Sequence, residues 1–119
     1  MANPNIVNVA NIYGKTAGLV VTTSNTAIVT NSASSGKVFK INSLVIANVD
    51  GVSSALITCT LNLAGTSFKL AHTITVPADG SLILIGKDNP IYLEENSSIQ
   101  LLASANGDLE ALCSYEDIS

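Results

Sequence analysis

Few side chains in this chain of 119 residues are suited to acid–base or nucleophilic chemistry, and they are scattered along it. A Ser-His-Asp arrangement needs a base beside a hydroxyl group, and His72 is the single histidine. It falls in an apolar run in which Leu70 and Ile74 share its face of an expected strand. This setting favours a structural histidine, buried or lining an interface, over a general base. We therefore predict no catalytic residues.

Acidic residues gather at expected turns and near the C-terminus. A glycosidase uses two carboxylates beside the scissile bond, and the candidates are Glu94, Glu95, Asp108, Glu110, Glu116 and Asp117. Aromatic residues make up only 4% of the chain and Trp is absent, so the stacking surface of a typical sugar site is missing. We interpret these carboxylates as solvated charges. A calcium site is the alternative, but no DxDxDG-type loop supports it, and we predict no metal.

The two cysteines and the glycines also lack the spacing of a reactive or ligand-binding site. Cys59 and Cys113 each lie in register with aliphatic neighbours and form no CxxC pair. This favours reduced core thiols, with a cross-strand disulfide as the alternative. Gly14-Lys15-Thr16 lacks the upstream glycine of a phosphate-binding loop. We expect no cofactor and no enzymatic activity.

Composition limits the partners of the chain. Charged residues are 12% of the sequence, against roughly 25% in ordinary soluble domains, while Asn, Ser and Thr fill 12, 14 and 10 positions. The net charge is -4 and Arg is absent, so we expect no nucleic-acid binding. No apolar run approaches the roughly 20 residues of a membrane span. The start of the chain lacks the basic and apolar regions of a secretory signal, which predicts a protein made in a cytoplasm.

The periodicity of the chain predicts its fold. Short aliphatic and Thr-rich runs alternate with turn residues, which is typical of an all-β, single-domain antiparallel β-sandwich spanning residues 1–119, jelly-roll-like, with eight or nine strands. Asp50-Gly51 and Asn106-Gly107 are expected hairpin turns. The expected strands are Leu19–Thr23, Thr26–Thr30, Val38–Val49, Ala55–Leu63, Phe68–Val76, Leu82–Ile85, Ile91–Leu93, Ile99–Ala105 and Leu109–Tyr115.

Alternation assigns faces to two of these strands. In Val38–Val49 it places Phe39, Ile41, Val45 and Ala47 on one face, and Lys40, Asn42, Leu44 and Ile46 on the other. Both faces are then partly apolar, as in a central or covered strand. In Phe68–Val76 it places Phe68, Leu70, His72, Ile74 and Val76 opposite Lys69, Ala71, Thr73 and Thr75.

Residues 1–14 interleave apolar side chains with asparagines. An N-terminal segment this apolar needs a partner surface, either as the first strand of the sandwich or as an extended arm on a neighbouring subunit. We expect its deletion, from Met1 to Tyr13, to leave a soluble fold but to abolish attachment to the partner. The candidate interface residues are Ile6, Val7, Val9, Ile12 and Tyr13.

Across nearly its whole length the chain resembles small virion structural proteins of tailed bacteriophages, particularly those of marine cyanobacteria. The segments that carry the resemblance are NIYGKTAGLVVTTSNTAIVTN, SGKVFKINSLVIANVDG, TITVPADGSLILIGKDNPIYLEENSSIQL and ASANGDLEALCSYEDI. The resemblance implies a non-enzymatic part of the particle, located in the virion and made in the host cytoplasm. It transfers no functional residues.

The resemblance leaves the place in the particle open. A capsid decoration or cement protein would bridge head subunits, as a trimer of copies of itself bound to the major capsid protein. The alternative is a tail, neck or fibre-associated component, structural or binding a receptor or carbohydrate. For the latter, aromatic residues should converge on a groove, whereas Tyr13, Tyr92 and Tyr115 fall in different segments. We predict the decoration protein.

Overall fold

The computed structural model describes residues 3–119, which form nine β-strands and no helix. The predicted all-β sandwich is therefore confirmed. The strands are β1 (Ile12–Val21), β2 (Thr26–Asn31), β3 (Val38–Asn48), β4 (Ala55–Leu63), β5 (Thr66–Val76), β6 (Ser81–Ile85), β7 (Ile91–Leu93), β8 (Ser97–Ala103) and β9 (Leu109–Ile118).

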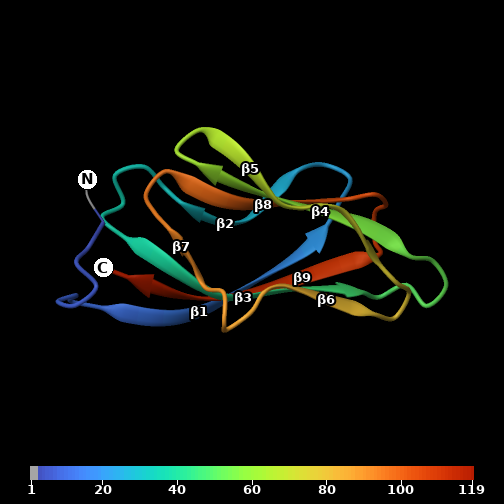
Figure 1. The fold of residues 1–119 in the computed structure, drawn as a ribbon, viewed down its shortest axis with the longest axis horizontal. Helices are drawn as coiled ribbons and strands as arrows, with labels where there is room; N and C mark the ends of the chain where they lie inside the picture. Colours follow the sequence, from blue (N-terminus) through green and yellow to red (C-terminus); the bar gives the residue numbers. More distant parts are fainter. Residues whose placement is uncertain (1–2) are drawn as a thin grey trace.

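The strands form two antiparallel sheets that face each other, seen as the upper and lower layers of Figure 1. The first sheet has the order β1-β9-β3-β6, with the short β7 also pairing with β3, and the second has the order β2-β8-β4-β5. The pairs β1·β9, β2·β8, β3·β6 and β4·β5 are those of one long antiparallel hairpin rolled over itself. This connectivity is the jelly roll.

The core fills the space between the sheets. Alternate residues of each strand point inward because successive side chains of a strand lie on opposite faces. The largest fully buried apolar side chains come from both layers, so neither sheet is stable without the other. They are Ile41, Leu44, Ile46, Ile57, Ile85, Leu93, Ile99, Leu101, Leu109, Val21 and Val76.

The expected alternation of β3 is wrong after Ile41. The pairing of β3 with β9 shifts register between Ile41 and Ser43, which marks a bulge at that point. A bulge adds one residue to a strand and exchanges the faces beyond it. Leu44 and Ile46 therefore point into the core, fully buried, while Val45 lies on the outer face. The strand is apolar inward throughout, and not evenly on both faces.

Two expected hairpin turns are corners between the sheets. Asp50-Gly51 joins β3 to β4 and Asn106-Gly107 joins β8 to β9, and each of these strand pairs is divided between the two sheets. The tight hairpin lies instead between β4 and β5, where Ala64 and Gly65 have φ angles of 53° and 92°. Positive φ at both central residues is the type I′ geometry that suits two-residue hairpins.

The expected faces of β5 are also wrong, because β5 is an edge strand with two register shifts against β4. Ala71 is the residue that turns inward in the middle of the strand, and Phe68, Leu70 and Ile74 are exposed. His72 is exposed as well. The histidine is therefore not part of the core.

Candidate functional site

The predicted interface residues lie together at one end of the sandwich. Residues 3–11 precede the first strand, and Ile12 and Tyr13 begin β1, where they pair with Ile118 and Asp117 of β9. Met1 and Ala2 lie outside the described residues. Val7 is 91% exposed, Val9 is half-buried, and Ile6, Ile12 and Tyr13 are each slightly more than half exposed.

Residues 3–11, here called the N-terminal segment, fold back on their own domain. The backbone N–H groups of Ala10 and Asn11 donate to the carbonyl of Ser119, each at 2.9 Å. At the other end, the side-chain amide of Asn3 donates to Glu94 Oε1 at 2.5 Å. Between these ties Ile6 lines a shallow apolar hollow of about 230 Å³ with Tyr92. The segment is thus held at both ends, and its apolar side chains stay accessible.

The residues considered for acid–base chemistry do not converge. His72 is on the edge strand β5, Glu94 and Glu95 are at the start of the turn before β8, and Glu110 and Glu116 are on β9. Within residues 3–119, no three His, Cys, Asp or Glu side chains come close enough together to hold a metal ion.

The pKa values of two acids in neighbouring corners, Asp50 and Asp108, are shifted in opposite directions. Asp50 accepts hydrogen bonds from the backbone N–H groups of Val52 and Ser53, which lower its pKa. The pKa of Asp108 is raised, mainly by burial and then by the negative charge of Asp50. The two corners are held together by the backbone, where the N–H group of Val49 donates to the carbonyl of Asp108 at 2.8 Å.

Asp117 is a buried acid with two lysine partners. Its side chain is 2% exposed, and Oδ2 accepts from Lys15 Nζ at 2.8 Å and from Lys37 Nζ at 3.3 Å. Burial acts to raise the pKa of Asp117, but the two lysine hydrogen bonds and charges act against it and the net pKa is lowered. Because both ammonium groups bind this one carboxylate, the arrangement joins β1 and the residue before β3 to β9 and serves the fold.

Both cysteines are buried free thiols. Cys59 is on β4 and Cys113 is on β9, so they belong to opposite sheets and not to neighbouring strands. Burial raises the pKa of Cys59 to about 12 and that of Cys113 to about 11. Because the thiolate is the nucleophile, thiols with pKa values this high are poor nucleophiles at neutral pH. This agrees with the expected role of the two cysteines as core residues.

A second accessible apolar surface lies on the outer side of the first sheet. Leu112 of β9 lies opposite Gly18 of β1 and Val45 of β3, and Val45 lies opposite Ile83 of β6. These four residues form a row across four strands, here called the apolar row. Leu112 is 59% and Ile83 is 67% exposed.

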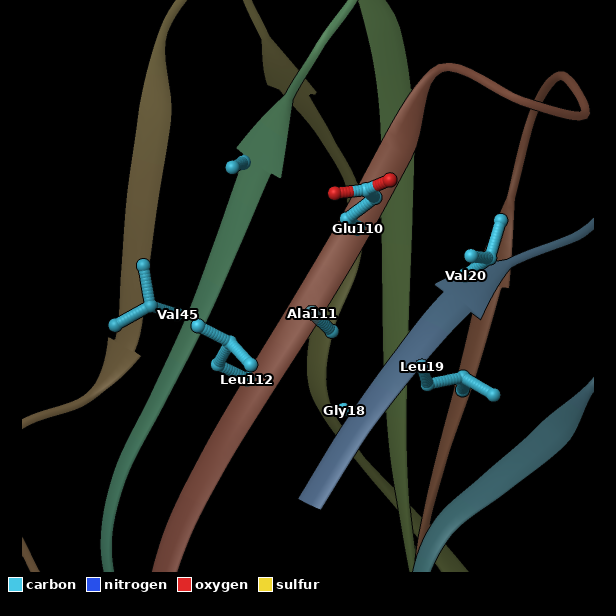
Figure 2. A pocket seen from close by; sticks show the side chains of 8 residues that line it. Gly18, Leu19, Val20, Val45, Glu110, Ala111 and Leu112 are labelled. Carbon is cyan, nitrogen blue, oxygen red and sulfur yellow. The ribbon is translucent and has the colours of Figure 1, made fainter. Parts of the chain in front are cut away.

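Glycine shapes the surface beside this row. Because Gly18 has no side chain, a shallow hollow of about 360 Å³ opens next to Leu112, with Val20 and Glu110 on its rim (Figure 2). The view shows that the lining side chains come from β1, β3 and β9. Glu110 supplies the one acidic group in this lining.

Sequence reasoning missed the apolar row. Gly18, Val45, Ile83 and Leu112 lie in four runs distant in sequence, and each occupies a single outward position there. The signal available was an aliphatic residue at a position that alternation assigns to solvent, and Leu112, between Ala111 and Cys113, gives it. The misassigned faces of β3 hid this signal at Val45.

No protein-family model matches the chain, and a search of curated proteins finds no match. Within residues 3–119 no helix is long and apolar enough to cross a bilayer.

Proposed function

We propose that this protein is a non-enzymatic structural component of a tailed-phage particle, a decoration protein that binds the head and stabilises it by bridging subunits. The observation that carries the proposal is the N-terminal segment, which presents apolar side chains outside the sandwich. Val7 is 91% and Ile6 is 53% exposed, although the segment is tied down at both ends. An ordered apolar surface of this kind favours a protein partner.

The fold supports the proposal without deciding it. Jelly rolls occur in viral capsid proteins and also in lectins, and a fold alone does not define a function. The composition adds support, because a surface rich in Asn, Ser and Thr and poor in charge packs against other subunits with little cost of desolvating ions. An interface of about 800 Å² per partner is enough for a stable contact, and repeated copies add avidity.

The first test is to locate the protein in particles of the virus that encodes it. An antibody raised against the purified chain, used in immunogold electron microscopy, should label the head lattice. Label on the tail, neck or fibres would support the alternative tail component and contradict the decoration role. Absence of the chain from purified particles by mass spectrometry would refute a structural role.

A matched pair of variants tests the N-terminal segment. Val7→Asp and Val52→Asp each change a valine that is about nine-tenths exposed, at 91% and 90%. We expect Val7→Asp to abolish binding to heads that lack the protein and Val52→Asp to retain it, measured by co-sedimentation. Equal binding by both would remove the segment from the interface. A truncation should stop at Val9, because Ala10 and Asn11 bind Ser119 and Ile12 starts β1.

A further inference from the structure

The apolar row on the first sheet lies between two rows of different polarity. On one side, Ser43, Ser114 and Thr16 lie opposite one another and present hydroxyl groups. Thr16 Oγ1 and Ser114 Oγ are 3.2 Å apart, so one hydroxyl donates to the other and the second keeps its proton for another acceptor. On the other side, Val20 and Ala47 lie opposite Glu110, which presents a carboxylate. Along the strands, the outer face of the first sheet therefore carries the hydroxyl row, then the apolar row, then the row that contains the Glu110 carboxylate.

The second sheet has a different surface. Two of its central pairs are polar, Thr60 with Gln100 and Asn62 with Ser98. Its exposed apolar side chains lie on β4 and the edge strand β5, and they include Leu56, Phe68, Leu70 and Ile74. The first sheet differs in that Leu112, Val45 and Ile83 form one row across three adjacent strands. An exposed apolar row bordered by polar groups marks a protein contact.

We propose that the occupant of this face is the same face of a second copy of the chain, turned by a two-fold axis that runs along the apolar row. Such a rotation reverses the strand direction and keeps each strand above its own copy. Leu112 and Val45 then meet their counterparts, and Leu112 of each copy lies beside the hollow over Gly18, which leaves room for both leucine side chains. The contact is isologous and closes at two copies.

The order of the rows makes the face complementary to itself. Glu110 and Ser114 lie two residues to either side of Leu112 on β9, about 7 Å each way at the usual strand rise. The rotation places the Glu110 carboxylate of one copy over the Ser114 and Thr16 hydroxyls of the other. A carboxylate only accepts hydrogen bonds, and this hydroxyl pair has one to give. A rotation that preserved strand direction would instead bring the two Glu110 side chains together.

The area of the face fits a pair of copies. Three strands of ten or eleven residues and the five-residue β6, about 4.8 Å apart, present roughly 550 Å² of surface, near the lower end of about 600 Å² per partner for a standard interface. Two sheets also stack well face to face, as in any sandwich. The proposal concerns the purified chain alone and does not depend on the proposed function.

The test is the solution mass of the full chain by light scattering after gel filtration, over a wide concentration range. We expect twice the monomer mass of 12.2 kDa. Leu112→Lys should return the monomer mass, because it places a charge on the axis. Val52→Lys, a change at an exposed valine outside the face, should leave the dimer intact. Both side chains are mostly exposed, so neither variant disturbs the core.

Exchanging charges at Glu110 and Ser114 tests whether the strands of the two copies run in opposite directions. Ser114→Glu should dissociate the dimer, because the new carboxylate faces Glu110 of the other copy. Adding Glu110→Lys to it should restore the dimer, because the introduced ammonium group then faces the introduced carboxylate across the interface.

Three results would overturn the proposal. They are a monomer mass for the unchanged chain at every concentration, a trimer or larger ring, and a double variant that stays monomeric. The trimer predicted from the resemblance would require a different, heterologous contact. Failure here would leave the particle-binding test of the N-terminal segment unaffected, since that test uses heads and a different surface.

Discussion

The bulge in β3 predicts that two neighbouring residues differ sharply in their contribution to stability. Ile46 is fully buried between the sheets, whereas Val45 is half-buried on the outer face. Ile46→Ala removes three carbon groups from the core, worth about 2.4 kcal/mol of transfer free energy. A residual cavity of about 60 Å³ adds about 1.5 kcal/mol. The free energy of unfolding should therefore fall by about 4 kcal/mol.

Val45→Ala removes two carbon groups that are already partly in water, so its cost should stay below about 1 kcal/mol. For a domain of this size, these changes correspond to melting temperatures lowered by about 15 °C and about 3 °C. The assay is urea unfolding followed by circular dichroism under reducing conditions. Both changes should be made in the Leu112→Lys background, so that dissociation of a dimer does not contribute. Without a bulge, alternation from Phe39 and Ile41 would bury Val45 and expose Ile46. A larger loss for Val45→Ala than for Ile46→Ala would therefore refute the bulge.

Three further predictions concern the ion cluster, the thiols and the hairpin. The pKa of Asp117 is lowered in the folded state, so its contribution to stability is full above the unfolded value of about 3.9 and is lost as pH falls through the folded value. Asp117→Asn should flatten the loss of stability at acid pH in urea titrations, and an unchanged pH dependence would contradict the lysine contacts. Cys59 and Cys113 should resist a thiol reagent at neutral pH and react only on unfolding, whereas rapid labelling of the native chain would contradict their burial. Ala64→Asn should stabilise the chain by about 0.5–1 kcal/mol, because Asn tolerates the φ of 53° better than Ala does, and a lower melting temperature would contradict the type I′ turn.

The sequence predicts the layers of this fold well because β8 and β9 alternate cleanly. Ile99, Leu101 and Ala103 are all buried, as are Leu109, Ala111 and Cys113. Such runs need one apolar face against a second sheet, which is enough to define a sandwich. The jelly-roll connectivity was expected only from the class of fold. The strand order that defines it depends on pairings between strands far apart in sequence, such as β1 with β9, and alternation within one strand does not indicate such pairings.

The errors of sequence interpretation arise where pairing, and not composition, determines geometry. A bulge in β3 needs no special residue type, so Asn42-Ser43 gives no warning that the faces exchange. Asp50-Gly51 and Asn106-Gly107 are turn signals in either setting. Whether the following strand pairs back as a hairpin or crosses to the other sheet depends on which strand already occupies the neighbouring position. β9 lies between β1 and β3, and so cannot pair with β8.

The N-terminal segment and the apolar row also differ in whether the sequence alone predicts them. The N-terminal segment could be found from the sequence, because its apolar residues are contiguous. The apolar row could not, because it unites Gly18, Val45, Ile83 and Leu112 through three strand pairings. Only the register shows that one outward residue of each strand falls on a common line.

Taken together, the two proposed surfaces give the dimer a bridging geometry. The two-fold axis along the apolar row reverses the strands, so the N-terminal segments of the two copies lie at opposite ends of the pair. Each molecule is 49 Å long, and its N-terminal segment and C-terminus are at the same end of the sandwich (Figure 1). A dimer then carries one attachment segment at each end and can connect two neighbouring sites, whereas a monomer occupies one. Leu112→Lys should for this reason retain attachment at each site but lose the avidity of the bridged pair, while Val7→Asp should leave a dimer that binds at neither end.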